Sequence, residues 1–458
     1  MKSLSKFQLI LLVVFGALAI SGILIFALFV GRGSTNTVGS ITIWGTLDVG
    51  AFSTVIRQAS ENTGELSGVV YEQKDPATYY TELTNALANG QGPDLFLMRE
   101  DQAMKNMGKV FIIPYEILSR SEFESTFAAA AAPFLTSTGV EAIPLNVDPL
   151  VLYWNRDLLA SAGYVRPPQY WDEVVPMATY VVDGGAELNK NTITLRDQTG
   201  AIKKSAIAFG EYQNIPNAKD ILAALILQAG GTITTKDTVG HIVPGLQAKS
   251  VKGAQSTANA LRYFTGFADP SRDLYSWNRS LPDARAAFAA GDVGLYVGHV
   301  SEEPLIRQMN PNLNFFVAAL PQIRNSEFSL NTAHVYGFAI SRMSRNPTGA
   351  QTVAYMLASP ALSKNLSIAL SIPSAQVSTL QAAMQNTKTK AYENLKIKAS
   401  HDEAIALSAM TARAWIDPDP QETDAIFRAM IENTVSGAYR LEDAVQRADQ
   451  ELGHVLGL

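Results

Sequence analysis

The chain has 458 residues, a formal net charge of −6 and no cysteine. The lack of cysteine excludes disulfides, thiolate catalysis and cysteine-ligated zinc, and the acidic balance argues against a nucleic-acid surface, which needs a basic stripe. Hydrophobic residues make up 47% of the chain and charged residues 17%, as is typical of a packed globular protein.

The first predicted element is a membrane anchor. Phe7–Val30 is a run of 24 residues without a charge, with Lys2 and Lys6 before it and Arg32 after it. A helix of that length spans roughly 36 Å, enough for the ~30 Å hydrocarbon core of a bilayer. Because no small-residue cleavage site follows the run, we expect an uncleaved single-pass anchor, with its N-terminus cytoplasmic and the remainder of the chain outside.

Alternating strands and helices follow a short flexible linker. Strands are predicted at 41–44, 69–72 and 95–98, and helices at 52–59 and 80–87 lie between them. Such alternation predicts a parallel sheet with helices on its faces. Downstream, strands are predicted near 151–154, 293–297, 314–320 and 336–340. Further helices are expected at 157–162, from about 171, and at 218–229, 283–290, 424–435 and 441–456.

Several of these segments resemble the extracellular solute-binding proteins of ABC importers, in the sugar-binding, maltose-binding-protein-like group. Six pieces appear in the order of that family: ITIWGTLD at Ile41–Asp48, YYTELTNALANGQGPDLFLM at Tyr79–Met98, AIPLNVDPLVLYWNRDLLASAGYVRPPQYWDEV at Ala142–Val174, ARAAFAAGDVGLYVGH at Ala284–His299, FFVAALP at Phe315–Pro321 and YGFAISRMSRNP at Tyr336–Pro347.

The resemblance implies an α/β, two-lobe periplasmic-binding-protein-like fold (type II) behind the N-terminal transmembrane helix. It implies three crossings between the lobes, near Ile143–Asn146, Asn314 and Ile372–Pro373. Residues 1–34 would then be the cytoplasmic stub and anchor, 35–39 the linker, 40–145 and 315–372 the N-lobe, and 146–314 and 373–458 the C-lobe.

Polar residues at the ends of predicted strands are the first candidates for ligand binding. In an open parallel sheet, ligands bind beyond the carboxyl ends of the strands. This rule selects Thr46 and Asp48 after the first strand, and Glu100, Asp101 and Gln102 after the third. The resemblance adds Asp148, just past the first crossing, where the family often carries an acidic residue that reaches ligand hydroxyls.

Aromatic side chains are the second kind of candidate, because sugars bind with their C–H faces on aromatic rings. Trp277 lies in a loop before a helix, and Trp415 precedes the Pro418–Pro420 break. We expect both to stack on ligand. His299 is also a candidate, although the family often carries a tryptophan soon after the glycine matching Gly298. This departure weakens any transfer of maltodextrin specificity.

No catalytic constellation is evident. The paired carboxylates Glu100–Asp101 and Glu302–Glu303 are adjacent in sequence, whereas a glycosidase needs two carboxylates across a cleft. The histidines show no metal-ligand spacing, and no G-x-S-x-G, P-loop or G-x-G-x-x-G motif is present. We therefore expect a non-enzymatic protein without a metal or other cofactor.

The sequence thus predicts a membrane-anchored, extracellular or periplasmic, monomeric solute-binding protein. It would capture a small solute, which the resemblance implies to be a carbohydrate, and deliver it to the permease subunits of an ABC transporter. Two alternatives remain open at this point: a surface sensor or adhesin that uses the same fold, and a carbohydrate-active enzyme.

Overall fold

The computed structural model describes residues 38–182, 191–248, 255–386 and 393–458. The predicted anchor at Phe7–Val30 lies outside these residues. Within them, no helix combines the length and the apolar character needed to cross a bilayer.

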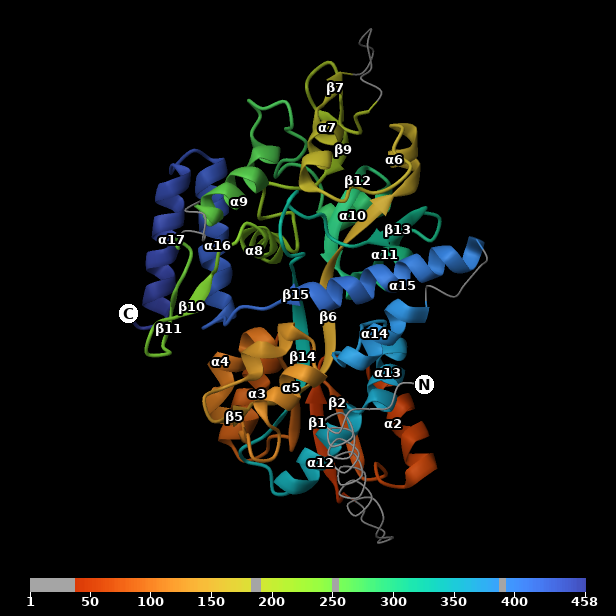
Figure 1. The fold of residues 1–458 in the computed structure, drawn as a ribbon, viewed down its shortest axis with the longest axis vertical. Coiled ribbons are helices and arrows are strands. Elements are labelled where there is room, and N and C mark those ends of the chain that lie inside the picture. Colours follow the sequence, from red (N-terminus) through yellow and green to blue (C-terminus); the bar gives the residue numbers. More distant parts are fainter. Residues whose placement is uncertain (1–37, 183–190, 249–254, 387–392) are drawn as a thin grey trace, which may run out of the picture.

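Two separate hydrophobic cores divide the described chain, and Figure 1 shows the two lobes that they form. The core of the N-lobe takes its buried side chains from residues 41–147, 333–380 and 406–412. The core of the C-lobe takes them from residues 150–320 and 426–452. The predicted two-lobe α/β architecture is therefore confirmed.

The cores correct two predicted boundaries between the lobes. Phe315 and Val317 belong to the C-lobe core, because their strand pairs with the C-lobe part of a long central strand. Ala375 and Leu380 belong to the N-lobe core, and the Ala375 N–H donates to the Leu145 carbonyl at 2.9 Å. The chain thus changes core between 320 and 333 rather than near Asn314, and between 412 and 426 rather than at Ile372–Pro373.

The N-lobe begins with the predicted strand–helix alternation. Its strands and helices are β1 (Ile41–Gly45), α2 (Val49–Thr63), β2 (Val69–Gln73), α3 (Tyr79–Ala88), β3 (Leu95–Arg99), α4 (Ala103–Asn106), β4 (Ile113–Pro114), α5 (Arg120–Thr126), β5 (Gly139–Val140), α12 (Pro347–Leu357), α13 (Pro360–Leu370) and α14 (Val377–Asn386). Strand β1 lies between β2 and β3 and is parallel to both, as predicted.

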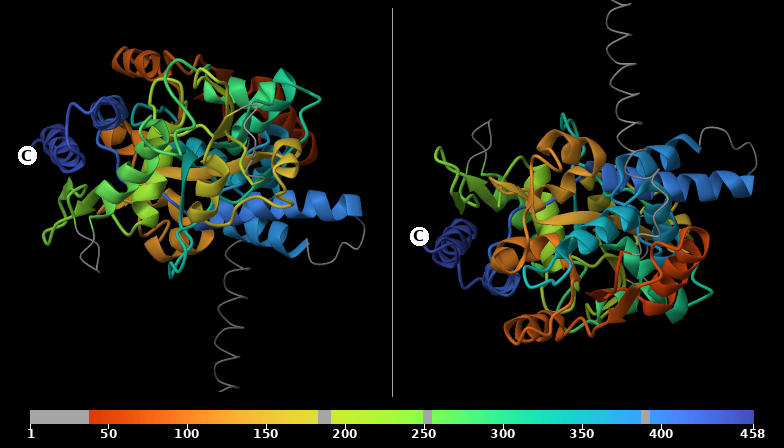
Figure 2. Two further views of the ribbon diagram at one scale, coloured as in Figure 1. Left: turned by 90° about the horizontal axis from the view of Figure 1, so that it is seen from above. Right: turned by 90° about the horizontal axis from the view of Figure 1, so that it is seen from below.

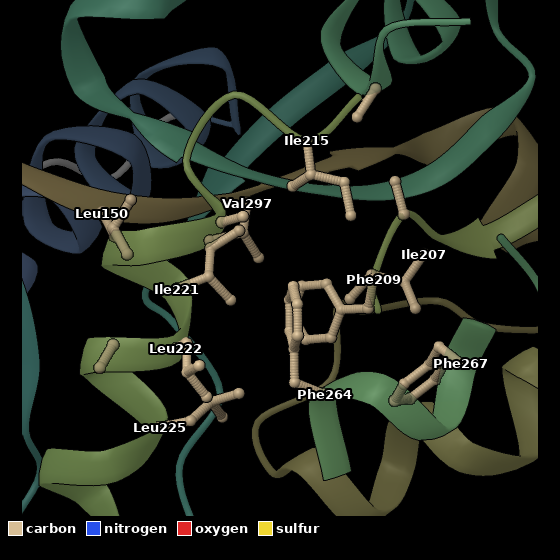
Figure 3. Packing of buried hydrophobic residues seen from close by; sticks show 14 of the residues in the cluster. Leu150, Ile207, Phe209, Ile215, Ile221, Leu222, Leu225, Phe264, Phe267 and Val297 are labelled. Atoms are coloured by element: carbon tan, nitrogen blue, oxygen red, sulfur yellow. The ribbon is translucent and has the colours of Figure 1, made fainter. Parts of the chain in front are cut away.

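The C-lobe is built from α6 (Arg156–Ser161), α7 (Val174–Ala178), β7 (Val181–Val182), β8 (Leu195–Arg196), β9 (Ile202–Ile207), α8 (Ala218–Gln228), β10 (Thr234–Lys236), β11 (Ile242–Pro244), α9 (Ser256–Thr265), α10 (Ala284–Ala290), β12 (Val293–His299), α11 (Glu303–Met309), β13 (Phe315–Ala318), α16 (Pro420–Val435) and α17 (Leu441–Val455). Figure 2 shows α16 and α17 side by side at the edge of this lobe. Figure 3 shows its core, in which the neighbouring rings of Phe209 and Phe264 face the leucines of α8.

Within the described part of the chain, four elements join the lobes: β6 (Ala142–Asn155), β14 (Asn331–Ile340), α15 (Glu393–Thr411) and β15 (Ala412–Arg413). Strands β6 and β14 pair antiparallel and run through the middle of an 11-stranded sheet, in the order β2-β1-β3-β14-β6-β12-β9-β8-β7. Strand β13 adds to β6, and β15 adds to β14. Because β6 and β14 belong to both lobes, the ends of β3 and β12 are brought to opposite sides of one interlobe space.

Candidate functional site

A cavity of about 710 Å³ lies between the two lobes. The N-lobe side consists of the end of β3, the short helix Glu100–Gln102 and β14. The C-lobe side consists of the start of α8, the end of β12 with the short helix Val300–Glu302, and the segment 414–424. Most of the lining side chains are ionisable or polar.

Arg99 and Asp101 form an ion pair on the N-lobe side. Arg99 Nε donates to Asp101 Oδ1 at 2.9 Å, and Nη2 donates to Oδ2. Burial alone would raise the pKa of Asp101, but the guanidinium of Arg99 outweighs burial and lowers it. The charge of Asp101 is therefore fixed and largely compensated before any solute enters.

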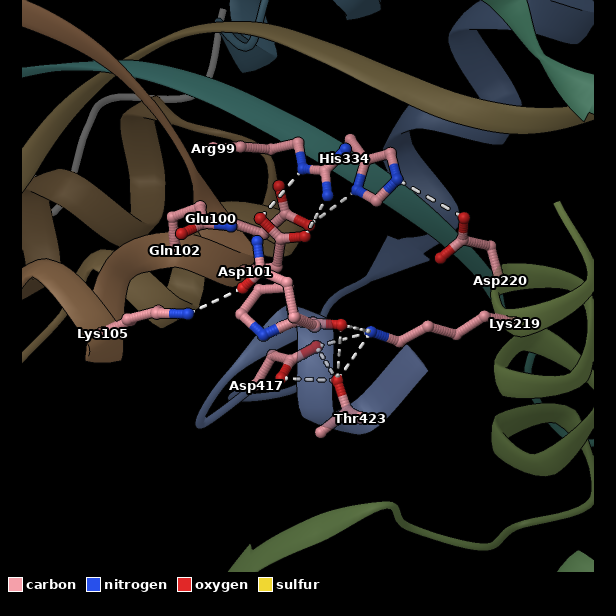
Figure 4. Close-up of polar contacts among 12 residues, drawn as sticks. Arg99, Glu100, Asp101, Gln102, Lys105, Lys219, Asp220, His334, Asp417 and Thr423 are labelled. Atoms are coloured by element: carbon pink, nitrogen blue, oxygen red, sulfur yellow. Dashed lines mark hydrogen bonds and ion pairs between the residues drawn. The ribbon is translucent and has the colours of Figure 1, made fainter. Parts of the chain in front are cut away.

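Asp220 lies between two histidines of different strands. Its Oδ2 is 3.3 Å from Nε2 of His299, at the end of β12, and 3.4 Å from Nε2 of His334, on β14. The two rings stack with their centroids 4.6 Å apart. Burial would raise the pKa of Asp220, but the two histidines outweigh it and lower the pKa well below its ordinary value. Figure 4 shows Asp220 facing His334 across the interlobe space.

The Nδ1 atom of each ring has a hydrogen-bond partner of its own. His299 Nδ1 lies 2.9 Å from the carbonyl oxygen of Asp148, and His334 Nδ1 lies 3.0 Å from Glu100 Oε1. Glu100 also accepts a hydrogen bond from the Val335 N–H. These contacts fix both ring orientations.

Lys219 and Asp417 form a buried pair within the C-lobe. Lys219 Nζ lies 2.8 Å from Asp417 Oδ2 and 2.7 Å from Thr423 Oγ1 (Figure 4). Burial raises the pKa of Asp417 to about 6, even though Lys219 acts in the opposite direction.

At the rim of the interlobe space, Lys105 of α4 donates to Asp419 Oδ1 at 2.8 Å and to Gln421 Oε1 at 2.7 Å. The Lys105 contacts connect the lobes directly.

Glu302 accepts hydrogen bonds from several groups of the C-lobe wall. Its Oε2 accepts from the Tyr296 hydroxyl at 2.6 Å and from Arg285 Nη1 at 3.2 Å, and its Oε1 accepts from the His299 N–H at 2.9 Å. Gly298 leaves room for this arrangement. A Cβ there would lie 2.6 Å from the Tyr296 ring and 2.9 Å from Glu302 Oε1, far inside contact distance.

Trp415 supplies the aromatic part of the wall. Its ring is partly buried and stacks on Phe427 with the centroids 6.2 Å apart. The ammonium of Lys219 lies 5.4 Å from the centroid of the Trp415 ring. An apolar face next to fixed charges suits a ligand that has both C–H faces and hydroxyls.

The structure brings together six of the nine predicted ligand-binding residues. The cavity lining includes Glu100, Asp101, Gln102, Asp148, His299 and Trp415. Asp148 Oδ1 also accepts from the Ser301 N–H at 3.0 Å. Contact of these residues with a ligand remains a prediction.

Three predicted residues lie elsewhere. Trp277 is 2% exposed in the C-lobe core, where its indole N–H donates to Asn214 Oδ1 at 3.1 Å, so the prediction of a cleft-facing ring is wrong. Asp48 is an exposed N-cap of α2, accepting from the Ala51 N–H at 2.7 Å. Thr46 lies in the turn before that cap and does not line the cavity. Both follow the end of β1, which runs parallel to β3 but is separated by β3 from the central strands β14 and β6.

The sequence analysis missed Lys219, Asp220, Arg285 and His334. The strand-end rule could not have found His334, because this residue lies inside β14 and not at its carboxyl end. Asp220 is an acidic residue in the first turn of α8, which is also where helices favour acids for their own stability. Asp220, His299 and His334 are also the described residues that could hold a metal, because their ligand atoms lie within 4.8 Å of one another.

The sequence of this chain matches the model of one known protein family. The family model of the bacterial extracellular solute-binding protein matches residues 57–363. Family members are binding proteins, so the predictions of this family and of a non-enzymatic protein are confirmed.

Solved structures of the same fold are similar over nearly the whole chain. An ABC transporter solute-binding protein from Thermotoga lettingae TMO, bound with α-D-tagatose, has a TM-score of 0.63 and 19% identity, covering 92% of this chain and 100% of its own. A cyclo/maltodextrin-binding protein complexed with maltotetraose has a TM-score of 0.67 and 15% identity, covering 91% and 96%. The cyclic α-maltosyl-1,6-maltose binding protein from Arthrobacter globiformis has a TM-score of 0.70 and 15% identity, covering 91% and 98%. At these identities the likeness concerns the fold.

Proposed function

This chain belongs to the bacterial extracellular solute-binding protein family, and we propose that it captures a small carbohydrate between its lobes and delivers it to an ABC transporter permease. The observation that carries the proposal is the interlobe cavity, which combines preorganised carboxylates and cations with the face of Trp415. Carboxylates accept hydrogen bonds from sugar hydroxyls and the cations donate them, while the indole covers a C–H face. The sugar ligands of the three solved structures support this choice.

Ligand would act by favouring a closed arrangement of the lobes. A solute that contacts Glu100 and Asp101 on one side and Asp220 and Trp415 on the other interacts fully only when the lobes are together. The permease would then recognise the closed form. Uptake of radiolabelled ligand into proteoliposomes that contain the permease should require this protein; binding without any effect on uptake would favour the sensor alternative.

A thermal-shift screen of monosaccharides and oligosaccharides tests the carbohydrate part. A ligand present at 100 times its Kd stabilises the folded protein by about 2.7 kcal/mol. We expect at least one sugar to raise the melting temperature. If no sugar does so while charged solutes such as amino acids do, the carbohydrate assignment fails and solute capture stands.

We also propose that Phe7–Val30 remains attached and holds the protein, as a monomer, at the outer face of the membrane. The uncharged run and the lysines before it support this topology. N-terminal sequencing of protein from the membrane fraction should begin near Met1. A mature N-terminus near Ser34 would contradict anchoring by this segment.

A further inference from the structure

Asp220, His299 and His334 each place one possible metal-ligand atom in the same part of the cavity wall. The carboxylate is in the first turn of α8, one imidazole is at the end of β12, and the other is on β14. The three atoms lie within 4.8 Å of one another. Imidazole nitrogen with carboxylate oxygen is a donor set that suits Zn²⁺ and similar transition-metal ions.

The hydrogen bonds behind the rings decide which nitrogen is available. A carbonyl oxygen only accepts, so His299 Nδ1 must carry the proton that it donates to Asp148, at 2.9 Å. The same reasoning assigns the Nδ1 proton of His334 to its bond with the Glu100 carboxylate, at 3.0 Å. In the neutral rings both Nε2 lone pairs then face Asp220. Metal-ligating histidines characteristically have this support from a carboxylate or a carbonyl.

The two distances from Asp220 Oδ2 to the histidine nitrogens fit ligands of one metal ion better than direct ion pairs. Charge-assisted N–H···O⁻ hydrogen bonds are about 2.7–2.9 Å long. Asp220 Oδ2 is 3.3 Å from His299 Nε2 and 3.4 Å from His334 Nε2. A tetrahedral ion with ligands at about 2.1 Å separates those ligands by about 3.4 Å.

The surroundings favour a dication. The side chain of His299 is 7% exposed, that of His334 16% and that of Asp220 22%. Glu100 adds a second carboxylate beside His334, while Arg99, a cation of the same cavity wall, is paired with Asp101.

We propose that Asp220, His299 and His334 form a binding site for one divalent transition-metal ion of the Zn²⁺ class. Three protein ligands leave a fourth tetrahedral position for water or for an oxygen of a solute in the cavity. Because β14 belongs to the N-lobe side and α8 and β12 belong to the C-lobe, the ion links the lobes. The site does not depend on the solute being a carbohydrate.

Calorimetric titration of the chelator-treated, full-length chain with Zn²⁺ alone tests the proposal. We expect saturation at one ion per chain, and ligand-field absorption bands with Co²⁺ that disappear when Zn²⁺ is added. X-ray absorption of the Zn²⁺-loaded chain should show two imidazole ligands. An absence of saturable binding, or fewer than two imidazoles, overturns the site, and neither result bears on the sugar screen because no sugar is present.

Substitution of each side chain by an amide of similar shape tests which residues bind the ion. Glu100→Gln should weaken Zn²⁺ binding roughly 10–100-fold, as the loss of a support behind a ligand does, and His334→Gln and Asp220→Asn should weaken it more. His241→Gln is the matched control, since His241 is 73% exposed in its side chain and pairs with Asp237 away from the cavity. Undiminished binding in both His334→Gln and Asp220→Asn, with melting temperatures near that of the parent, overturns the assignment.

Discussion

Glu303 of α11 and His401 of α15 form an ion pair at the junction of the lobes, with Glu303 Oε2 2.9 Å from His401 Nε2. Residues near Glu303 on α11 pack in the C-lobe core through Ile306, whereas those after His401 pack in the N-lobe core through Ala406. The pair therefore joins a helix of one lobe to the helix that connects them. Burial lowers the pKa of His401, but Asp402 and Glu303 outweigh it and raise the pKa to about 9.

This pair makes stability depend on pH. The pKa of His401 is higher in the folded chain than the value of about 6.5 in the unfolded chain, so its contribution is complete below pH 6.5 and is lost as the pH rises through about 9. Between pH 6 and pH 9.5, the parent should lose on the order of 1–3 kcal/mol more unfolding free energy than His401→Gln. Urea denaturation at both pH values measures the difference. Equal losses in the two proteins would mean that the ion pair does not stabilise the fold.

The two tryptophans that the sequence suggested for stacking should now behave differently. Trp415→Ala removes an aromatic wall of the cavity and should weaken binding of the cognate solute by about 1–3 kcal/mol with little change in stability. Trp277→Ala removes a buried core ring and its bond to Asn214, and should cost about 3–5 kcal/mol of folding stability. Isothermal titration and urea denaturation of both variants separate these effects. A stable Trp277→Ala protein would contradict the core assignment.

The alternation of strands and helices in residues 41–98 predicted the first part of the N-lobe correctly, because each buried face there repeats with a helical or strand period. The same signal failed for α15. Its sequence, ENLKIKASHDEAIALSAMT, has no single apolar stripe, and the helix packs against elements of both lobes. The third crossing, which follows α15, was therefore placed too early in the chain.

The residues that line the cavity were only partly predictable from the sequence. Glu100, Asp101 and Gln102 follow β3 directly, so a rule on strand ends found them. Asp220, His299 and His334 are far apart in sequence, and only the pairing of β14 and β12 with β6 brings the two histidines together. Trp277 was misassigned because a loop position says nothing about burial: Ser276 and Trp277 bond to the Phe267 carbonyl and turn the ring inward.

Glu141 is a buried carboxyl group that destabilises the fold at neutral pH. It is 2% exposed, and neither Oε atom has a hydrogen-bond partner among the described residues. Burial raises its pKa to about 8. For an acid whose pKa is higher in the folded chain, stability falls as the pH rises from about 4.5 to about 8.

Glu141→Gln should therefore stabilise the protein at pH 8 by an amount of the order of 2 kcal/mol, and much less at pH 4.5. Thermal denaturation of the parent and the variant at the two pH values provides the measurement. Glu122→Gln, on the exposed side of α5, is a suitable control. A stabilisation that is the same at both pH values would show that removal of charge is not its cause.

Contacts of Lys105 with Asp419 and Gln421 should hold the lobes together at the rim of the cavity. These hydrogen bonds, at 2.8 Å and 2.7 Å, connect α4 of the N-lobe to the start of α16 in the C-lobe. The Lys105 side chain is 39% exposed, so the contribution of its pair to global stability is small, about 0–1 kcal/mol. The balance between open and closed lobes involves energies of only a few kcal/mol, so even a weak interlobe contact shifts it.

We expect Lys105→Ala to increase the radius of gyration of the ligand-free protein in small-angle scattering, and saturating solute to return it to the value of the closed parent. Arg120→Ala is the control, because Arg120 pairs with Glu124 within α5, at 2.9 Å, and crosses no lobe boundary. Solute should also lower the radius of the parent if its ligand-free form is partly open. If the radius of Lys105→Ala equals that of the control with and without solute, the Lys105 contacts do not govern closure. A solute that binds the parent and both variants without any change in radius would contradict the proposal that the permease recognises a closed form induced by the solute.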